Sequence, residues 1–411
     1  MWRGKDRRWI GTEKGSILII VGFAMVVMLA VSAIAIDLVN LYLARTQAQR
    51  AADAAALAGA QAFISTGCTT GGCNPGGIQE TFATQQAVAA AAQNNIAGQP
   101  AAVDPASDVV FSYPTATEPQ ITVTTGRSVG TFFAKVFGIQ TVNVSAKATA
   151  EAYNQVGDSN TKLGATCVKP FLLPNCDPLH TSSGINNSCP STNGAQGYFF
   201  QPGTQDQLLN PGLYPTGVQG MPWSLHSDGG PSQWYLAGFA DAAASSASAI
   251  RSHIAMCTPA IYACGDYLPT ANGTTVGGVM LGTNDLIHAD SNGLNHGQDS
   301  IDTTTGPPFA ITGGYNNPNP ALRGKVFYDY SQSSSVVTVP VYDGSSLPPG
   351  GTTVQIKGYM QVFIRDIRLV GTDKTIDSVI LNVSYCGDSS GSTTTVASAG
   401  APIPIRLIRT N

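Results

Sequence analysis

The chain has 411 residues, a length that allows two or three compact domains. Only 11% of its residues are charged, whereas glycine (45) and proline (25) are abundant, a mixture typical of short strands joined by polar turns. The formal net charge of −4 gives no basis for binding nucleic acid, so we expect no nucleic-acid partner.

The first predicted element is a transmembrane helix over residues 16–36. These residues carry no charge, and at about 1.5 Å per residue they span roughly 31 Å, the thickness of the hydrocarbon core of a bilayer. Residues 1–15 form a basic segment in which lysine and arginine outnumber aspartate and glutamate. The positive-inside rule keeps this segment in the cytoplasm and places the chain after Asp37 on the other side of the membrane.

Two other interpretations of this apolar segment remain open. A cleavable secretory signal has a shorter apolar run, although the small-residue site Ala33-Ile34-Ala35 would suit cleavage. A prepilin leader would be cut after Gly15, but processed pilins carry glutamate five residues past the cut, where this chain has Ile20. We therefore predict an uncleaved anchor.

The helix is predicted to continue beyond the membrane to Ala62, because residues 37–62 contain no proline and a single glycine, Gly59. Alternating spacings of three and four place a stripe of small residues on one helical face. The stripe comprises Leu41, Ala44, Ala48, Ala51, Ala55, Ala58 and Ala62. Either alanine serves helix stability alone, or the stripe allows close packing, which we favour. The packing partner is the protein's own globular part or another subunit.

Four polar residues lie away from this stripe, and two of them are spaced to form a pair. They are Arg45, Gln47, Arg50 and Asp53, of which Arg50 and Asp53 are three residues apart.

The segment from Glu13 to Ala62 closely resembles the N-terminal segment of TadE/TadG-like Flp pilus-assembly proteins. The positions that match the family pattern are Glu13, Gly15, Asp37, Tyr42, Arg45, Gln47, Ala51, Ala52, Asp53, Ala54, Ala55, Leu57, Ala58 and Gly59. The resemblance implies a protein of the bacterial inner membrane that builds or anchors a pilus and has no catalytic residues. Its implied partners are the membrane and other pilus-assembly proteins or pilins, bound through the N-terminal helix.

A weaker resemblance to the same family covers a small strand–strand–helix–strand unit that follows the anchor. Alternation of apolar and polar residues independently predicts strands around Ile121 and Val123 and around Val142, Val144 and Ala146. Apolar residues at helical spacing predict a short helix over Val129–Phe137, ended by Gly138.

The remainder of the chain is predicted to be rich in strands. Residues 153–165 are polar and rich in turn-forming residues, which indicates a linker. The patterns that follow predict strands at 325–330, 335–342, 354–365 and 379–385, a turn at 348–351, and one helix at 237–255.

The eight cysteines predict disulfides. They are Cys68, Cys73, Cys167, Cys176, Cys189, Cys257, Cys264 and Cys386, with no C-x-x-C pair that would indicate zinc. Their even number in an exported region indicates disulfides, although buried free thiols are the alternative. Eight cysteines allow 105 pairings. We expect the neighbours Cys68–Cys73 and Cys257–Cys264 to pair, because short turns can bring their Cα atoms close enough.

Two motifs in the distal region resemble functional sites. Residues 387–392 match a hydrolase nucleophile pattern, yet no histidine follows them, and too little chain remains for the metal-binding domain that they also resemble. Residues 285–302 concentrate aspartate, asparagine and histidine, but their spacing does not fit an EF-hand, so calcium binding stays undecided. We assign no residue to catalysis, to a cofactor or to a metal.

The predicted fold is α+β, in four parts. These are a cytoplasmic basic segment (1–15), a transmembrane helix (16–36), a helix with a small mixed unit (37–152), and a larger strand-rich distal domain (166–411). The predicted function is a structural or assembly role in a Tad-type pilus, without enzymatic activity or a small-molecule substrate. The alternatives are a cell-surface binding protein or adhesin with the same anchor and, last, an exported hydrolase.

Overall fold

The computed structural model describes twelve stretches of the chain. These are residues 14–154, 161–176, 198–203, 207–227, 235–237, 246–271, 276–289, 297–343, 353–370, 373–387, 393–396 and 403–408. The predicted turn at 348–351 and most of the motif at 387–392 lie outside the described residues, as does the basic segment up to residue 13.

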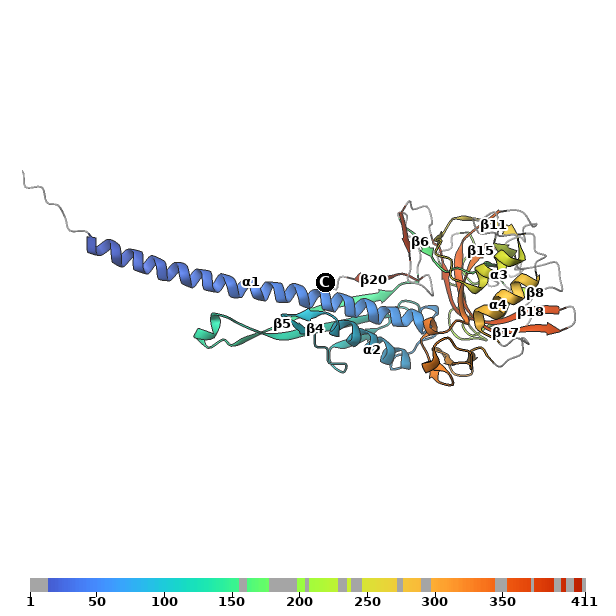
Figure 1. Ribbon diagram of the computed structural model, residues 1–411, viewed down its shortest axis with the longest axis horizontal. Helices are drawn as coiled ribbons and strands as arrows, with labels where there is room; N and C mark the ends of the chain where they lie inside the picture. The colour runs from blue at the N-terminus through green and yellow to red at the C-terminus, as the bar shows by residue number, and fades with distance from the viewer. Residues whose placement is uncertain are drawn as a thin grey trace, which may run out of the picture.

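One helix dominates the N-terminal part of the molecule. Helix α1 runs without interruption from Lys14 to Ser65, 52 residues, and confirms the predicted continuous helix. Its N-terminal end extends away from the rest of the molecule, and its second half lies against a small sheet (Figure 1). The absence of proline and the many alanines explain why the helix continues beyond the apolar segment.

The second half of α1 covers one face of a four-stranded antiparallel sheet with the order β20-β5-β4-β3. Its strands are β3 (Val109–Ser112), β4 (Gln120–Gly130), β5 (Thr141–Ala152) and β20 (Ile405–Ile408). The predicted alternation is confirmed, since Ile121, Val123, Val144 and Ala146 are buried. Helix α2 (Ile78–Ala92), which the sequence analysis did not predict, packs beside α1. A two-stranded ribbon, β1 (Asn95–Ile96) and β2 (Gln99–Pro100), follows it.

The predicted helix over Val129–Phe137 is wrong for most of its length. Strand β4 continues to Gly130, where Val129 pairs with Val142 and Gly130 with Thr141 of β5. Only the single turn η2 (Ala134–Phe137) is helical, and Gly138 ends it with a left-handed φ of 88°. The first residues of the segment join the hairpin rather than a helix, because pairing with β5 gives the backbone cross-strand hydrogen bonds at alternate residues.

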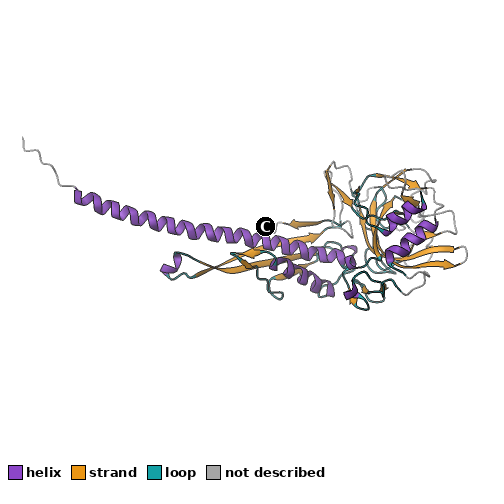
Figure 2. Cartoon of the chain, in the orientation of Figure 1, coloured by secondary structure: helices purple, strands orange, loops and turns teal. Residues whose placement is uncertain are grey.

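The distal part is built on a curled sheet (Figure 2). This sheet has eight strands in the order β16-β11-β9-β7-β15-β17-β18-β8. Its strands are β7 (Phe171–Pro174), β8 (Pro222–Ser227), β9 (Tyr235–Ala237), β11 (Tyr267–Ala271), β15 (Val336–Tyr342), β16 (Thr353–Gln355), β17 (Gly358–Val370) and β18 (Asp373–Tyr385). Helices α3 (Ala247–Ala255) and α4 (Val276–Ile287) share its main hydrophobic core.

Two small sheets complete the distal part, and the molecule as a whole is α+β, as predicted. One sheet contains β10 (Tyr262–Ala263), β6 (Thr161–Ala165) and β19 (Thr393–Val396). The other contains β12 (Ser300–Asp302), β13 (Ala310–Thr312) and β14 (Val326–Phe327). The turns η1 (Cys68–Thr70), η4 (Pro320–Leu322) and η5 (Tyr330–Gln332) are short 3-10 helices.

The sequence analysis misplaced several distal elements. The helix predicted at 237–255 begins at Ala247, whereas Ala237 belongs to β9 and residues 238–245 lie outside the described part. The predicted linker at 153–165 contains strand β6. The strand predicted at 325–330 shortens to β14, because the Asp329 side chain accepts a hydrogen bond from Ser331 N and starts η5.

The disulfides confirm one predicted pair and contradict the other. Cys68 is bonded to Cys73, with their Cα atoms 5.0 Å apart. The predicted Cys257–Cys264 pair is wrong, because Cys257 is bonded to Cys167 (Cα–Cα 4.4 Å) and Cys264 to Cys386 (5.5 Å). Backbone pairing explains the difference.

Two backbone hydrogen bonds place the bonded cysteines. Cys167 N donates to Thr258 O (3.1 Å), beside Cys257, while Cys264 N donates to Leu163 O (2.7 Å) at the end of the β10–β6 pair. Cys176 is also disulfide-bonded, and Cys189 lies outside the described residues.

A buried polar network joins the end of α1 to the distal sheet. Asn382 of β18 accepts a hydrogen bond from Thr70 Oγ1 (3.1 Å) and donates to Ile64 O (3.2 Å). Asn154 Nδ2 donates to Thr69 O (2.5 Å) and Val383 O (3.0 Å). Buried amides with partners on both sides fix one relative arrangement, so the helix, the small unit and the distal sheet are rigidly joined at this point.

Lys169, next to the Cys167–Cys257 disulfide, is a buried cation whose ammonium group hydrogen-bonds to a backbone carbonyl. Its Nζ donates to Met256 O at 2.8 Å, and burial lowers the pKa of Lys169 to about 8.

We expect the free energy of unfolding to rise with pH between about 8 and 10, on the order of 2 kcal/mol, because the unfolded chain binds this proton more tightly than the folded one. Urea unfolding across this pH range measures the rise in the free energy of unfolding. The rise should disappear in Lys169→Met and persist in Lys325→Met, which replaces an exposed lysine. A parent curve parallel to that of Lys169→Met would contradict the assignment. Above about pH 10 the free energy of unfolding should fall again, because burial raises the pKa of the Tyr330 and Tyr359 phenols and the unfolded chain loses these protons more readily than the folded one. The pH range of the measurement therefore ends there.

Candidate membrane and assembly surface

The first half of α1 exposes a continuous apolar surface. Large apolar side chains from Ile17 to Leu43 point into the surroundings, and the apolar window within residues Ile17–Ser65 has no buried residue. In the described part of the chain, α1 is the one helix long and apolar enough to cross a membrane. Exposed apolar surface of this extent is stable in lipid and not in water, so this half of α1 has the length and the surface of a single membrane anchor.

The second half of α1 is buried by the protein itself. Ala44, Ala48, Ala51 and Ala55 of the predicted stripe are at most 1% exposed, and they pack within the small unit. Of the two partners that the sequence left open, the structure therefore shows the protein's own globular part. The stripe uses small residues because α1 lies close both to the sheet and to α2.

Gly59 shows how closely these elements approach. A Cβ atom at this position would lie 2.4 Å from Ile121 Cδ1 of β4 and 3.2 Å from Ala83 O of α2. Ala83 and Ala87 of α2 are fully buried. Contacts as short as these exclude any larger residue at position 59 unless its neighbours move.

One predicted side-chain pair on the polar face of α1, Arg50 with Asp53, does not form. Asp53 accepts a hydrogen bond from Gln49 Nε2 (2.8 Å), four residues earlier, in place of the predicted pairing with Arg50. Gln47 Oε1 accepts from Ala97 N (2.8 Å) of the turn between β1 and β2. Arg45 and Arg50 are exposed.

Asp37, the first charged residue after the apolar segment, holds the tip of the β4–β5 hairpin against α1. Its Oδ1 accepts a hydrogen bond from Phe132 N (2.7 Å), and its Oδ2 accepts from Phe133 N (3.0 Å) and Ala134 N (2.7 Å). Burial acts to raise the pKa of Asp37, but these three donors and the nearby charge of Lys135 outweigh it, so the pKa lies below its usual value.

The sequence analysis noted Asp37 only as a flanking charge and as a family position. The carboxylate satisfies N–H groups at the start of η2 that have no acceptor within the turn itself. Because 95 residues separate Asp37 from Phe132, no local pattern could reveal this contact. The available signal was a conspicuous acidic residue directly after the apolar segment.

We expect Asp37→Asn to loosen the hairpin tip, because asparagine offers one acceptor oxygen without charge where three N–H groups now converge. Hydrogen exchange of the full-length protein should become faster in peptides that cover 131–139, with little change in α2. The matched control is Asp104→Asn, since Asp104 also accepts a backbone hydrogen bond, from Ala106 N (3.0 Å). Unchanged exchange at the tip would contradict the role given to Asp37.

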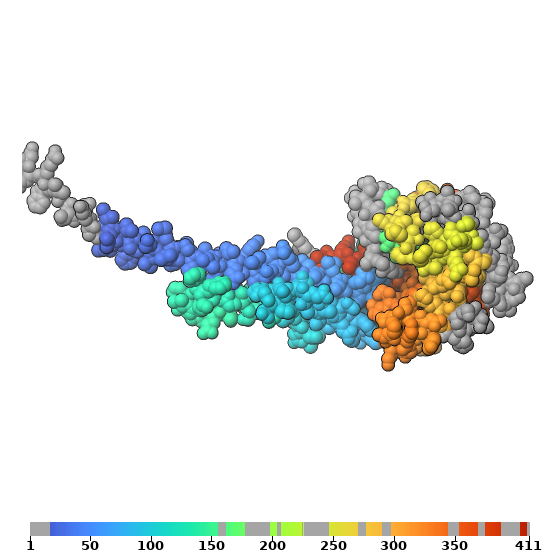
Figure 3. Space-filling model, in the orientation of Figure 1, coloured from blue at the N-terminus to red at the C-terminus, as the bar shows by residue number. Residues whose placement is uncertain are grey.

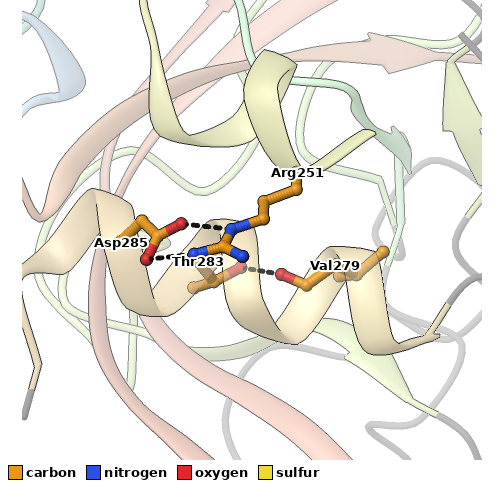
Figure 4. Close-up of polar contacts among 4 residues, drawn as sticks. All are labelled: Arg251, Val279, Thr283 and Asp285. Atoms are coloured by element: carbon orange, nitrogen blue, oxygen red, sulfur yellow. Dashed lines mark hydrogen bonds and ion pairs between the residues drawn. The ribbon is translucent and has the colours of Figure 1, made fainter. Parts of the chain in front are cut away.

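The polar segment at 285–302 uses its described carboxylates within the protein. Asp285 of α4 forms a bidentate ion pair with Arg251 of α3, at 2.5 and 3.1 Å (Figure 4). Asp299 is buried and accepts hydrogen bonds from Asn317 Nδ2 (2.8 Å) and Ser333 Oγ (2.6 Å). Among the described residues, no three His, Cys, Asp or Glu side chains are grouped so as to hold a metal ion. Residues 290–296 lie outside the described part.

A family model confirms the resemblance of the N-terminal segment. Residues 15–62 match the model described as putative Flp pilus-assembly TadE/G-like. The matched residues coincide with nearly all of α1, so that the small sheet and the distal part lie beyond the match. Neither the curated proteins nor the solved structures include a match to this chain.

Proposed function

From the TadE/G-like domain in residues 15–62, we propose that this protein is a structural or assembly component of a Tad-type (Flp) pilus system in the bacterial inner membrane. The observation that carries the proposal is the coincidence of the family match with α1, whose first half is exposed and apolar and whose second half forms the core of the small unit. The protein acts through its surfaces rather than as an enzyme.

The proposed orientation has the N-terminus in the cytoplasm and everything after Asp37 in the periplasm or outside the cell. Two independent features support this orientation. The residues before the apolar segment are rich in lysine and arginine. The three disulfides formed between described cysteines all lie beyond Asp37, and disulfides persist in oxidising compartments.

The proposed partners are the membrane and other pilus-assembly proteins or pilins. The buried alanine stripe cannot receive them, because the small unit occupies it. Contacts with partners therefore fall on the exposed face of α1, where Tyr42 is 75% exposed just beyond the apolar segment. A tyrosine at this level offers both a flat apolar ring and a hydroxyl, a combination that suits protein interfaces near the membrane.

Photocrosslinking from α1 in native membranes tests this proposal. With p-benzoylphenylalanine in place of Tyr42, we expect adducts to pilus-assembly proteins or pilins, identified by mass spectrometry. The matched control carries p-benzoylphenylalanine in place of Tyr315, which is similarly exposed (79%) but lies in the distal part. Adducts at Tyr42 that contain no pilus component would contradict the proposal and favour an adhesin that shares the anchor.

The mature protein is expected to keep its N-terminal segment. N-terminal sequencing of protein extracted from membranes should recover the basic residues that precede the apolar segment, because the span of 21 uncharged residues (16–36) is too long for an ordinary signal. A mature terminus at Ser16 would instead indicate pilin-like processing, and one at Ile36 would indicate a secreted protein.

A further inference from the structure

The tip of the β4–β5 hairpin, residues 131–139, presents a cluster of exposed apolar side chains. Val136 and Phe137 are each 81% exposed, and Phe132 is 58% exposed. Phe133 and Ile139 are exposed as well. Single exposed apolar residues are common on protein surfaces, but five large ones within eight residues form a patch that calls for a partner.

The position of this tip along α1 indicates which partner it meets. Phe133, Val136 and Phe137 of the tip line a groove together with Ala30 and Ile34 of α1. Both of these α1 residues lie inside the predicted membrane span. With Ile36 at the edge of the hydrocarbon core, Ala30 is about 9 Å deeper along the helix, so the tip reaches below the membrane surface.

The space-filling view shows the same arrangement. The tip is the part of the small unit that lies furthest from the distal sheet, directly against the apolar half of α1 (Figure 3). The apolar surface of the tip is therefore continuous with that of the anchor. A surface that continues an anchor in lipid is itself exposed to lipid.

Hydrogen bonds within the protein satisfy much of the backbone of the tip, as an apolar environment requires. Seven N–H groups of residues 131–139 donate to acceptors within the protein, and Asp37 accepts from three of them. The other four bonds are Thr131 N to Gln140 O, Val136 N to Phe133 O, Gly138 N to Lys135 O and Ile139 N to Ala134 O, at 3.0 to 3.2 Å. Unsatisfied N–H groups are costly in lipid, so the pairing of these seven groups within the protein lowers the free-energy cost of insertion.

The charge of the tip fits the membrane interface. Lys135 is the sole charged residue between Gly130 and Gln140, and it is exposed. A lysine can extend its ammonium group to lipid phosphates while its alkyl chain stays among apolar side chains.

We propose that residues 131–139 form a second membrane contact, which inserts beside α1 into the leaflet on the non-cytoplasmic side, with acyl chains filling the groove between η2 and α1. The inference rests on α1 as the membrane anchor and goes beyond a role in pilus assembly. Two contacts, one spanning and one at the interface, fix the tilt of the small unit relative to the membrane, and the buried network at Asn382 passes this orientation to the distal sheet.

Photocrosslinking to lipid tests the insertion in the full-length protein reconstituted into vesicles of phosphatidylcholine and phosphatidylglycerol. Three variants carry p-benzoylphenylalanine in place of Phe137, Phe23 or Tyr315. Phe23 is 71% exposed in the apolar half of α1 and reports on the anchor, while Tyr315 reports on an exposed aromatic site in the distal part. We expect lipid adducts from positions 137 and 23 and none from position 315.

Three results would overturn the proposal. Lipid adducts from position 23 without any from position 137 would support α1 as the anchor and contradict the second membrane contact. Adducts from position 137 to a second protein chain rather than to lipid would make the tip a protein-binding surface. Absence of lipid adducts from both positions would contradict the membrane anchor as well as the membrane contact of the tip.

Discussion

Replacing Cys264 and Cys386 together by alanine is expected to lower the free energy of unfolding by about 4–5 kcal/mol, because this disulfide closes a loop with a sequence separation of 122 residues. The bond ties the end of β10 to the end of β18, and both cysteines are buried in the core cluster that includes Ile356 and Tyr359. Urea unfolding of the purified protein measures the change.

The Cys68–Cys73 disulfide provides the matched control for this measurement. Its sequence separation is 5 residues, so its removal should cost only about 2 kcal/mol by the same loop-entropy argument. Equal losses for the two double replacements would contradict the account. Mapping of non-reduced peptides gives an independent check, since a peptide pair linking Cys257 to Cys264 would overturn the pairing.

Ala55→Leu is expected to destabilise the small unit by about 1–3 kcal/mol, because a leucine side chain has no space where α1 meets the sheet. Ala55 is fully buried in the core cluster that contains Ile121, Val123 and Ala150. Thermal unfolding of the full-length protein in detergent provides the measurement.

Arg50→Leu is the control for Ala55→Leu, because it introduces the same side chain on the exposed face of the same helix. A change within about 0.5 kcal/mol is expected there. Gln47 is a poorer control, since its side chain accepts a hydrogen bond from Ala97 N. Equal stability of Ala55→Leu and Arg50→Leu would mean that the alanines serve helix propensity alone.

Elements with an uninterrupted local pattern were predictable from the sequence. The continuous helix at 16–62, the alternating strands around Ile121 and Val144, and parts of β17 and β18 follow from periods of 3.6 or 2 residues. The strand predicted at 354–365 is in fact divided between β16 and β17, which continues to Val370, and β18 begins at Asp373 rather than at the predicted residue 379. The N-terminal family segment was likewise predictable, because it lies within a single helix.

Features that depend on distant partners were not predictable. Strand β20 pairs with β5 along the backbone, and Arg406 Nε also donates a hydrogen bond to Glu151 Oε1 at 2.5 Å, between residues 255 positions apart in the sequence. The partners of Cys257 and Cys264 are likewise set by strand pairing rather than by proximity in the chain.

The error at the hairpin tip has a physical cause. Phe132, Phe133, Val136 and Phe137 have helical spacing, which normally indicates a face buried in a core. In the structure these side chains are exposed beside the membrane span, so the apolar pattern does not report a buried helix.

The most direct test of the central claim is the number of pili on cells that lack the gene. We expect deletion to abolish Flp-type pili under electron microscopy and the full-length chain to restore them. A version with residues 1–36 replaced by a cleaved secretory signal should reach the periplasm without restoring pili, because it lacks the anchor. Normal pili on the deletion strain would contradict a role in pilus assembly.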